Sequence, residues 1–208
     1  MRADLEAIDA ASRKVLDAKY RAREIGLTNS RQAIRRCANS IRALHRGEAE
    51  RAEELMVEAS DLLAEAAQKL EGHPDILHAG FLSDACKEYA EARLFQALAA
   101  GKPLPLPEDL QVWVVPYLHG LGEAAGEMRR RMLDLLRAGD LESAEAALEA
   151  MDGILELLAG LDYPDGMTSG LRRTTDVTRA LIERSRSDLT TTVIQERLRR
   201  SLEDAGGS

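Results

Sequence analysis

Three acidic side chains recur at helical spacing in the segment "SDACKEYAEARLF", which contains no helix-breaking residue. Asp84, Glu88 and Glu91 fall within about 60° of one another on a helical wheel, and Leu77 and Phe95 lie inside the same arc. Carboxylates in line with core positions are unfavourable unless they are paired or bind a metal ion. Spacing alone does not show whether these acids are functional, because a chain with 36 acidic residues produces such patterns by chance.

A second acidic pair lies in the segment "GLGEAAGEMRR". Glu123 and Glu127 are one helical turn apart and share a face. Arg130 lies on the same side, so this face is also compatible with simple solvation. Gly122 and Gly126, again one turn apart, would allow another helix to approach closely.

If these two helical segments face each other, their acidic side chains form one cluster. Hard oxygen ligands at that density suit Mg²⁺ or Mn²⁺, and such a site can activate water and stabilise an in-line displacement at phosphorus. A ferritin-like di-iron site would need Glu-x-x-His on two helices, and none of the four histidines has that spacing. The candidate catalytic and metal-binding residues are Glu88, Glu91, Glu123 and Glu127.

A basic stripe follows the segment "SRQAIRRCANSIRALHR" near the N-terminus. Four of its five arginines, all but Arg36, fall within about 60° on a helical wheel, without interleaved acids, and would form a track for phosphate groups. Aromatic residues are scarce there, so base stacking on the stripe is not expected. The alternative is a solvated face that pairs with glutamates of a neighbouring helix. The candidate nucleic-acid-binding residues are Arg31, Arg35, Arg42 and Arg46.

The composition favours packed helices over sheets, since only 3% of the 208 residues are aromatic and 45% are hydrophobic. A formal charge of −8 excludes a chain that is basic overall, so phosphate binding requires a local basic patch. The two cysteines do not form a disulfide framework, which favours a reduced, cytoplasmic setting. We find no signal-peptide-like run and no stretch that approaches a membrane span.

We expect one all-α domain over 1–208, with a frayed tail at about 204–208. The first helix contains no residue before Gly47 that would end it. About 43 residues at about 1.5 Å per residue span on the order of 65 Å. A compact globule of this length has a diameter of roughly 45 Å, so the helix would overhang and neighbouring copies would cover its apolar stripe. The expected helices are 4–46, 48–70, 74–101, 118–138, 140–158 and 171–203, the last with a bend at "DLTTT".

In their order along the chain, three segments resemble the translin family, and within it the translin-associated factor X branch more than translin proper. "LDAKYRAREIGLTNSRQAIRRCANSIRALHR" resembles the first helix of that branch. "KEYAEARLF" is similar to its Glu-Tyr-x-Glu-Ala motif, and "GLGEAAGEMRR" to its Gly-x-x-Asp-x-x-Gly-Glu-x-x-Arg motif. The resemblance implies a seven-helix α fold that assembles into a hollow, usually octameric shell and binds single-stranded nucleic acid.

Factor-X-type subunits are Mg²⁺-dependent endoribonucleases that act from the inner surface of the shell. By resemblance, Glu88 and Glu91 match the glutamates of the first motif, and Glu127 matches the glutamate of the second. Glu123 departs from the family, which has Asp at that position, and Asp84 matches no family ligand. The basic stripe occupies the region of the family's RNA-contacting residues.

The leading hypothesis is therefore a Mg²⁺-dependent (or Mn²⁺-dependent) endoribonuclease that binds single-stranded RNA, and also single-stranded DNA, as a homo-oligomer, most simply an octamer. A non-catalytic single-strand-binding module like translin proper is the alternative, and it predicts salt-dependent binding without metal-dependent turnover. A helical scaffold for a protein partner is the third hypothesis, and it predicts no affinity for nucleic acid.

Overall fold

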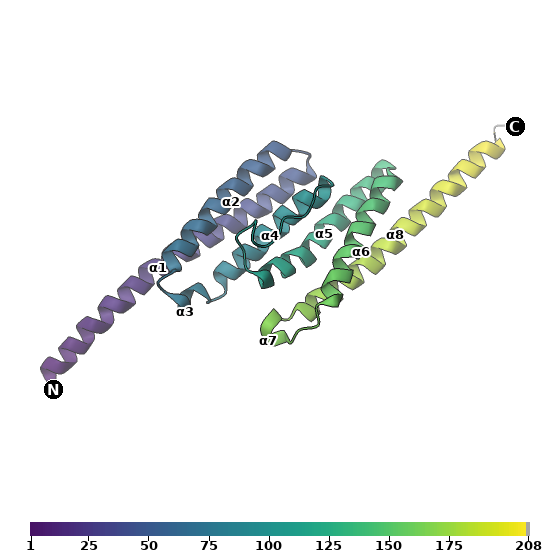
Figure 1. Ribbon diagram of the computed structural model, residues 1–208. Coiled ribbons are helices and arrows are strands. Elements are labelled where there is room, and N and C mark those ends of the chain that lie inside the picture. Colours follow the sequence, from purple (N-terminus) through teal and green to yellow (C-terminus); the bar gives the residue numbers. More distant parts are fainter. Residues whose placement is uncertain (207–208) are drawn as a thin grey trace. The chain divides into compact units, whose positions relative to one another are not determined.

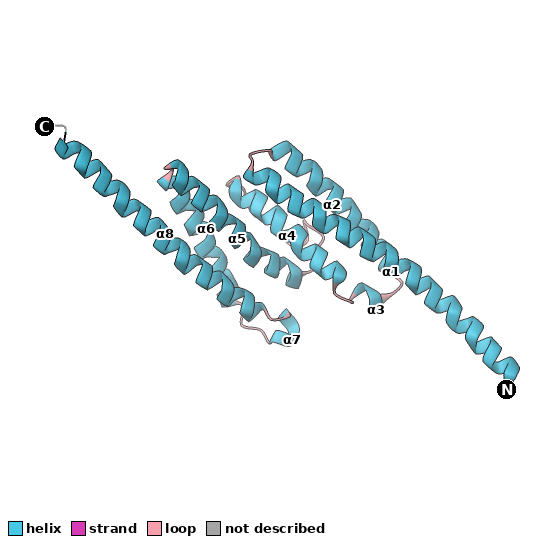
Figure 2. Cartoon of the chain, turned by 180° about the vertical axis from the view of Figure 1, so that it is seen from behind, coloured by secondary structure: helices cyan, strands magenta, loops and turns pink. Residues whose placement is uncertain are grey.

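The computed structural model describes residues 1–206 of the chain, and side chains as far as Asp204. These residues form helices and connecting loops and contain no strand (Figure 2), which confirms the expected all-α class. Six of the helices are long, and two, α3 and α7, have four residues each. The helices are α1 (Arg2–His45), α2 (Ala49–Leu70), α3 (Pro74–Leu77), α4 (Phe81–Ala99), α5 (Val114–Ala138), α6 (Leu141–Gly160), α7 (Asp165–Thr168) and α8 (Leu171–Gly206).

The chain divides into two compact units, Met1–Tyr89 and Ala90–Ser208, and the division falls inside the continuous helix α4. The single domain expected over 1–208 stays a prediction. Of its expected frayed tail, 204–206 belong to α8, and 207–208 lie outside the described residues.

The first unit is built on an antiparallel pair of helices, α1 and α2. Helix α1 has 44 residues and passes through Gly26 without a break, as the sequence predicts. A Cβ on Gly26 would lie 2.7 Å from Leu70 Cδ1, so the glycine permits close packing there. Beyond α2, the N-terminal part of α1 overhangs (Figure 1). Its exposed apolar side chains are Leu5, Ile8, Val15, Leu16 and Tyr20.

One predicted helix is wrong, because 74–101 forms two helices rather than one. Helix α3 ends at Leu77, and α4 begins at Phe81. Between them Gly80 has φ +98°, a left-handed conformation that an α-helix does not contain and that glycine adopts without steric penalty. The chain therefore turns at 78–80, and α4 starts as a separate helix.

The second unit is organised by α5, α6 and α8, which bury a common core. Helix α5 begins at Val114, ahead of Leu118, by which the sequence makes the helix clear. Pro116 lies in its first turn, where the missing N–H is not needed. The Tyr117 hydroxyl donates to the carbonyl of Pro105 at 2.8 Å and fastens the preceding proline-rich loop to α5. The largest buried core side chains of these helices are Leu121, Met132, Met151, Leu158 and Ile182.

Helices α5 and α8 approach closely at Gly122. A Cβ at this position would lie 2.4 Å from Thr174 Cγ2 and 3.3 Å from Thr178 Oγ1. Just before it, the His119 ring lies between two partners, with Nδ1 2.7 Å from Thr174 Oγ1 and Nε2 2.9 Å from the carbonyl of Thr168. Since a carbonyl only accepts, Nε2 carries a proton and donates it to the Thr168 carbonyl. Together these contacts hold the start of α8 against α5.

Helix α8 continues through 188–192, where the sequence predicts a bend. The hydroxyls of Thr190, Thr191 and Thr192 each donate to the carbonyl four residues earlier, which gives the β-branched side chains an internal partner. Within the described part of the chain, no helix is both long enough and apolar enough to cross a membrane.

We expect Gly122→Ala to destabilise the protein and Gly126→Ala to leave it unchanged or stabilise it. The added methyl group at 122 would overlap Thr174, which is held by His119, and overpacking of this kind costs about 1–3 kcal/mol. At 126 the nearest side-chain atom, Leu181 Cδ1, is 4.0 Å away, so the helix propensity of Ala favours folding by up to about 1 kcal/mol. Urea unfolding followed by circular dichroism measures the free energy of unfolding of both variants. Equal stabilities would contradict the close approach of α8 to α5 at Gly122.

Candidate functional site

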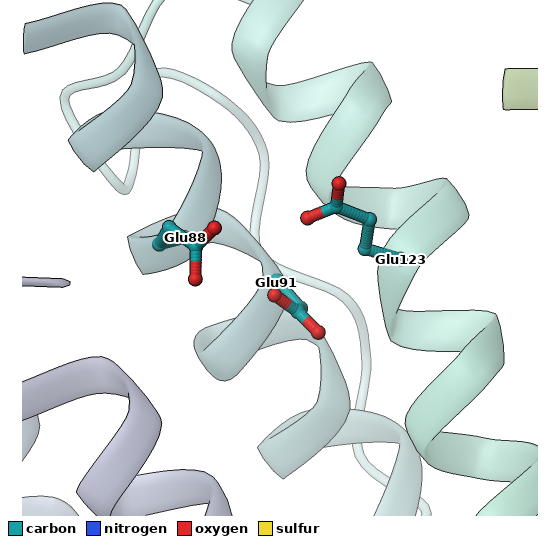
Figure 3. Close-up of side chains that lie close together, drawn as sticks. All are labelled: Glu88, Glu91 and Glu123. Atoms are coloured by element: carbon teal, nitrogen blue, oxygen red, sulfur yellow. The ribbon is translucent and has the colours of Figure 1, made fainter. Parts of the chain in front are cut away.

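Three glutamates of the predicted acidic set lie together. One carboxylate oxygen from each of Glu88, Glu91 and Glu123 lies within 4.8 Å of the other two, and all three side chains are half-buried. Figure 3 shows Glu88 and Glu91 one turn apart on α4, with Glu123 reaching toward them from α5. We call these three residues the acidic cluster.

The local sequence explains why these carboxylates are half-buried rather than solvated. On α4, the residues around Glu91 are small or apolar, and Tyr89, Ala90, Ala92 and Leu94 are buried. This leaves Glu91 at the edge of a packed surface. Within the same turn, the Lys87 ammonium lies 3.3 Å from Glu88 Oε1 and offsets part of the negative charge.

The fourth predicted glutamate, Glu127, and the neighbouring Asp84 lie outside the acidic cluster. Glu127 is half-buried one turn beyond Glu123 on α5, and Asp84 is exposed one turn before Glu88 on α4. The structure therefore brings together three of the four predicted glutamates. The assignment of Glu127 as a metal ligand stays a prediction.

A cavity of about 400 Å³ lies in the second unit, beside the acidic cluster. Glu91 and Glu123 line it together with Gly122 and Gly126 of α5, and the absence of a side chain at Gly126 leaves room there. Helix α8 contributes the remaining lining residues, Arg173, Thr174, Val177, Thr178 and Leu181.

The basic stripe on α1 is only partly available for phosphate binding. Arg31, Arg35 and Arg42 are exposed, and in the described part of the chain none of them forms an ion pair. Arg46 differs, because its guanidinium makes two 2.7 Å hydrogen bonds with Glu48. The hydrogen bonding to Arg46 lowers the pKa of Glu48, so that carboxylate stays ionised and the pair is maintained at neutral pH.

No protein-family model matches the chain. An uncharacterized protein of Methanocaldococcus jannaschii is 27% identical over 191 residues, which cover 88% of this chain and 82% of that protein. The solved structure of the complex of AfC3PO, from Archaeoglobus, with duplex RNA is 34% identical, covers 94% of this chain and 98% of that chain, and has a TM-score of 0.82. The chain belongs to the translin family.

A crystal structure of AfC3PO alone gives the same identity of 34% and TM-score of 0.82. The crystal structure of apo-NeC3PO, from Neurospora, is 20% identical, covers 89% of this chain and 96% of that chain, and has a TM-score of 0.79. At that identity it supports the translin-family fold alone.

The acidic cluster of this translin-family chain fits a small divalent cation. Carboxylate oxygens are the ligands that Mg²⁺ and Mn²⁺ prefer. Two oxygens bound on opposite sides of Mg²⁺ are about 4.2 Å apart, given metal–oxygen distances of 2.0–2.1 Å. The oxygens of the acidic cluster lie within 4.8 Å of one another, so small side-chain rotations would bring them into coordination range.

Sequence reasoning missed the α8 side of the site. Arg173, Thr174 and Thr178 line the cavity, and His119 holds Thr174, although none of them stands in a motif. Their spacing with respect to Glu123 is set by the packing of α8 on α5, which no local pattern encodes. The only hint of this packing in the sequence analysis was Gly122, whose lack of a side chain predicted that another helix could approach closely.

The thiols do not contribute to this site. Cys37 and Cys86 are both buried and free. Burial raises the pKa of the Cys86 thiol to about 11, so it is protonated and a poor nucleophile at neutral pH.

We expect Mg²⁺ or Mn²⁺ to raise the melting temperature of the protein, and the double substitution Glu91→Gln with Glu123→Gln to abolish that increase. A ligand that binds only the folded state stabilises it by about 2.7 kcal/mol at 100 times its Kd. The melting temperature of the variant without metal is the reference for its own metal-dependent increase, so a change in its intrinsic stability does not affect the comparison. Differential scanning calorimetry with and without metal measures both effects.

Asp84→Asn is the matched control, because it removes an exposed acid from the same helix without touching the acidic cluster. It should keep the full metal-dependent increase. Glu127→Gln tests the fourth predicted ligand in the same assay. A metal-dependent increase that persists in the double variant would exclude the acidic cluster as the binding site.

Proposed function

We propose that this translin-family chain is a factor-X-type, Mg²⁺-dependent endoribonuclease acting on single-stranded RNA. The observation that carries the proposal is the convergence of Glu88, Glu91 and Glu123. A protein that only bound RNA would have no need to hold three carboxylates within 4.8 Å of one another. The relative AfC3PO has been solved in complex with duplex RNA, which supports RNA as the ligand.

The reaction would be hydrolysis of a phosphodiester, in which water adds to phosphorus and the bond to a ribose oxygen breaks. When bound, Mg²⁺ or Mn²⁺ supplies Lewis acidity and lowers the pKa of a bound water. Glu88, Glu91 and Glu123 would hold the ion, and Glu127 lies one turn away as the fourth candidate. The side chain of Glu123, longer than the family's Asp, points from α5 toward α4 (Figure 3).

The basic stripe would bind the RNA backbone away from the scissile bond. Arg31, Arg35 and Arg42 offer exposed guanidiniums to phosphate oxygens, and such contacts make affinity depend on salt but not on sequence. Arg46 would contribute less, because RNA would first have to displace Glu48 from it.

One observation favours the alternative, a binding module without turnover. The Lys87 ammonium already pairs with Glu88, and a cation that is part of the chain can replace a metal ion in neutralising the acidic cluster. In that case the cluster would be structural, and RNA binding would not require a divalent metal.

We expect the chain to be a homo-oligomer with a molecular mass several times that of one copy, up to an octamer. Five apolar side chains on the overhanging part of α1 are 56–64% exposed, and a further copy would remove them from water. Light scattering coupled to size-exclusion chromatography measures the mass directly. A monomer of ordinary compactness would contradict this proposal.

The test of the enzymatic proposal is cleavage of a labelled single-stranded RNA in the presence of Mg²⁺. We expect cleavage with Mg²⁺, none with EDTA, and a loss of at least about 100-fold in the double variant Glu88→Gln with Glu91→Gln, because two of three ligands would be removed. Denaturing gel electrophoresis of the products gives the rate. A duplex RNA and a single-stranded DNA of the same sequence serve as comparison substrates.

The control is Asp84→Asn, which should cleave at the wild-type rate. Salt-dependent RNA binding without any cleavage in Mg²⁺ or Mn²⁺ would establish the binding module instead. Cleavage that is unchanged in the double variant would remove the acidic cluster from the mechanism.

A further inference from the structure

The cavity beside the acidic cluster carries opposite charges on facing elements. Glu91 of α4 and Glu123 of α5 contribute the carboxylates, and Arg173 of α8 contributes a guanidinium. All three residues line the same space of about 400 Å³, which lies wholly within the second unit. The proposed function uses only the acidic side of this cavity.

Arg173 differs from its neighbours on α8 in having no acidic partner in the described part of the chain. Arg172 lies 3.6 Å from Asp162, and Arg179 lies 2.8 Å from Asp176. No ion pair joins Arg173 to either carboxylate of the cavity, although all three line it. The guanidinium is therefore separated from the carboxylates by space rather than neutralised by them.

A phosphodiester is the group that fits between these charges. Its oxygens can contact a divalent cation on the acidic side and accept two parallel hydrogen bonds from a guanidinium on the other side. A neutral or cationic ligand would leave the positive charge of Arg173 without a counter-charge.

The remaining wall of the cavity is apolar and formed by α8. Val177 and Leu181 follow Arg173 at intervals of four residues, so the three side chains lie along one face of the helix. The hydroxyls beside them are already used, since Thr178 Oγ1 donates to the carbonyl of Thr174 and Thr174 Oγ1 contacts His119. This wall offers van der Waals contact but no base-specific hydrogen bonds, so it suits the flat face of any of the nucleobases.

We propose that the cavity binds one unstacked nucleotide of single-stranded RNA, with Arg173 contacting the phosphate to be cleaved and Val177 and Leu181 contacting its base. The inference rests on the proposed function and adds to it a substrate-binding residue and a reason for single-strand preference. A space of about 400 Å³ accommodates one nucleotide, whereas a base within a duplex would have to leave its stack to enter.

The test compares Arg173→Ala and Arg173→Lys with the matched control Arg172→Ala. Arg172 is the adjacent exposed arginine, and it lines a different cavity of about 350 Å³ together with Asp162. We expect Arg173→Ala to lower kcat/KM for single-stranded RNA in Mg²⁺ by about 100-fold, the effect of removing one donor that stabilises transition-state charge. Arg173→Lys should recover part of the loss, and Arg172→Ala should stay within about twofold of the wild type.

A second readout does not depend on turnover. Fluorescence anisotropy with a short labelled oligoribonucleotide in EDTA gives the Kd as a function of salt. One lost phosphate contact to a single strand should reduce the slope of log K against log salt by about 0.7 in Arg173→Ala. Arg172→Ala should retain the wild-type slope.

The outcomes separate this inference from the proposed function. If wild-type protein does not cleave RNA, the nuclease proposal fails, while a smaller salt slope in Arg173→Ala alone still supports the nucleotide site. If wild-type protein cleaves RNA and the Arg173→Ala and Arg172→Ala variants behave alike in both assays, the nucleotide site is wrong and the nuclease proposal stands. A greater effect on duplex than on single-stranded RNA would also overturn the inference.

Discussion

At Gly122, helix α8 lies so close to α5 that a side chain larger than hydrogen would overlap Thr174. The candidate site depends on this contact, because it sets which residues of α8 stand opposite Glu123. The His119 ring reinforces it by joining Thr174 to the carbonyl of Thr168. One glycine and one histidine thus fix the register between the acidic wall of the cavity and the wall that carries Arg173.

Charge balance is the second constraint on the site. Three half-buried carboxylates lie within 4.8 Å of one another, and the Lys87 ammonium lies 3.3 Å from one of them. Helix packing holds the three carboxylates at this distance, so the acidic cluster is preorganised for a cation. A phosphate could then bind against that cation and Arg173, which would make metal and substrate binding mutually supportive.

The two units contribute different kinds of surface to such a protein. In the first, α1 carries exposed arginines and an overhanging apolar stripe, features suited to backbone phosphates and to further copies of the chain. In the second, α5 and α8 form a small cavity with charged and apolar walls. The net charge of −8 is compatible with RNA binding only because positive charge is concentrated on particular helix faces.

The sequence by itself determined the all-α class, the uninterrupted first helix, and the pairing of Glu88 with Glu91, because these follow from composition and from helical periodicity. The helix predicted over 140–158 is present as α6, and the Asp140 carboxylate caps its start by accepting from the Ser143 amide at 3.1 Å. Sequence reasoning failed at Gly80, because a single glycine is compatible with both a helix and a turn, and the sequence does not show that φ here is +98°. Only the tertiary structure decided that Glu123 joins the acidic cluster and that Arg173 faces it, because those relations arise from packing between helices distant in sequence.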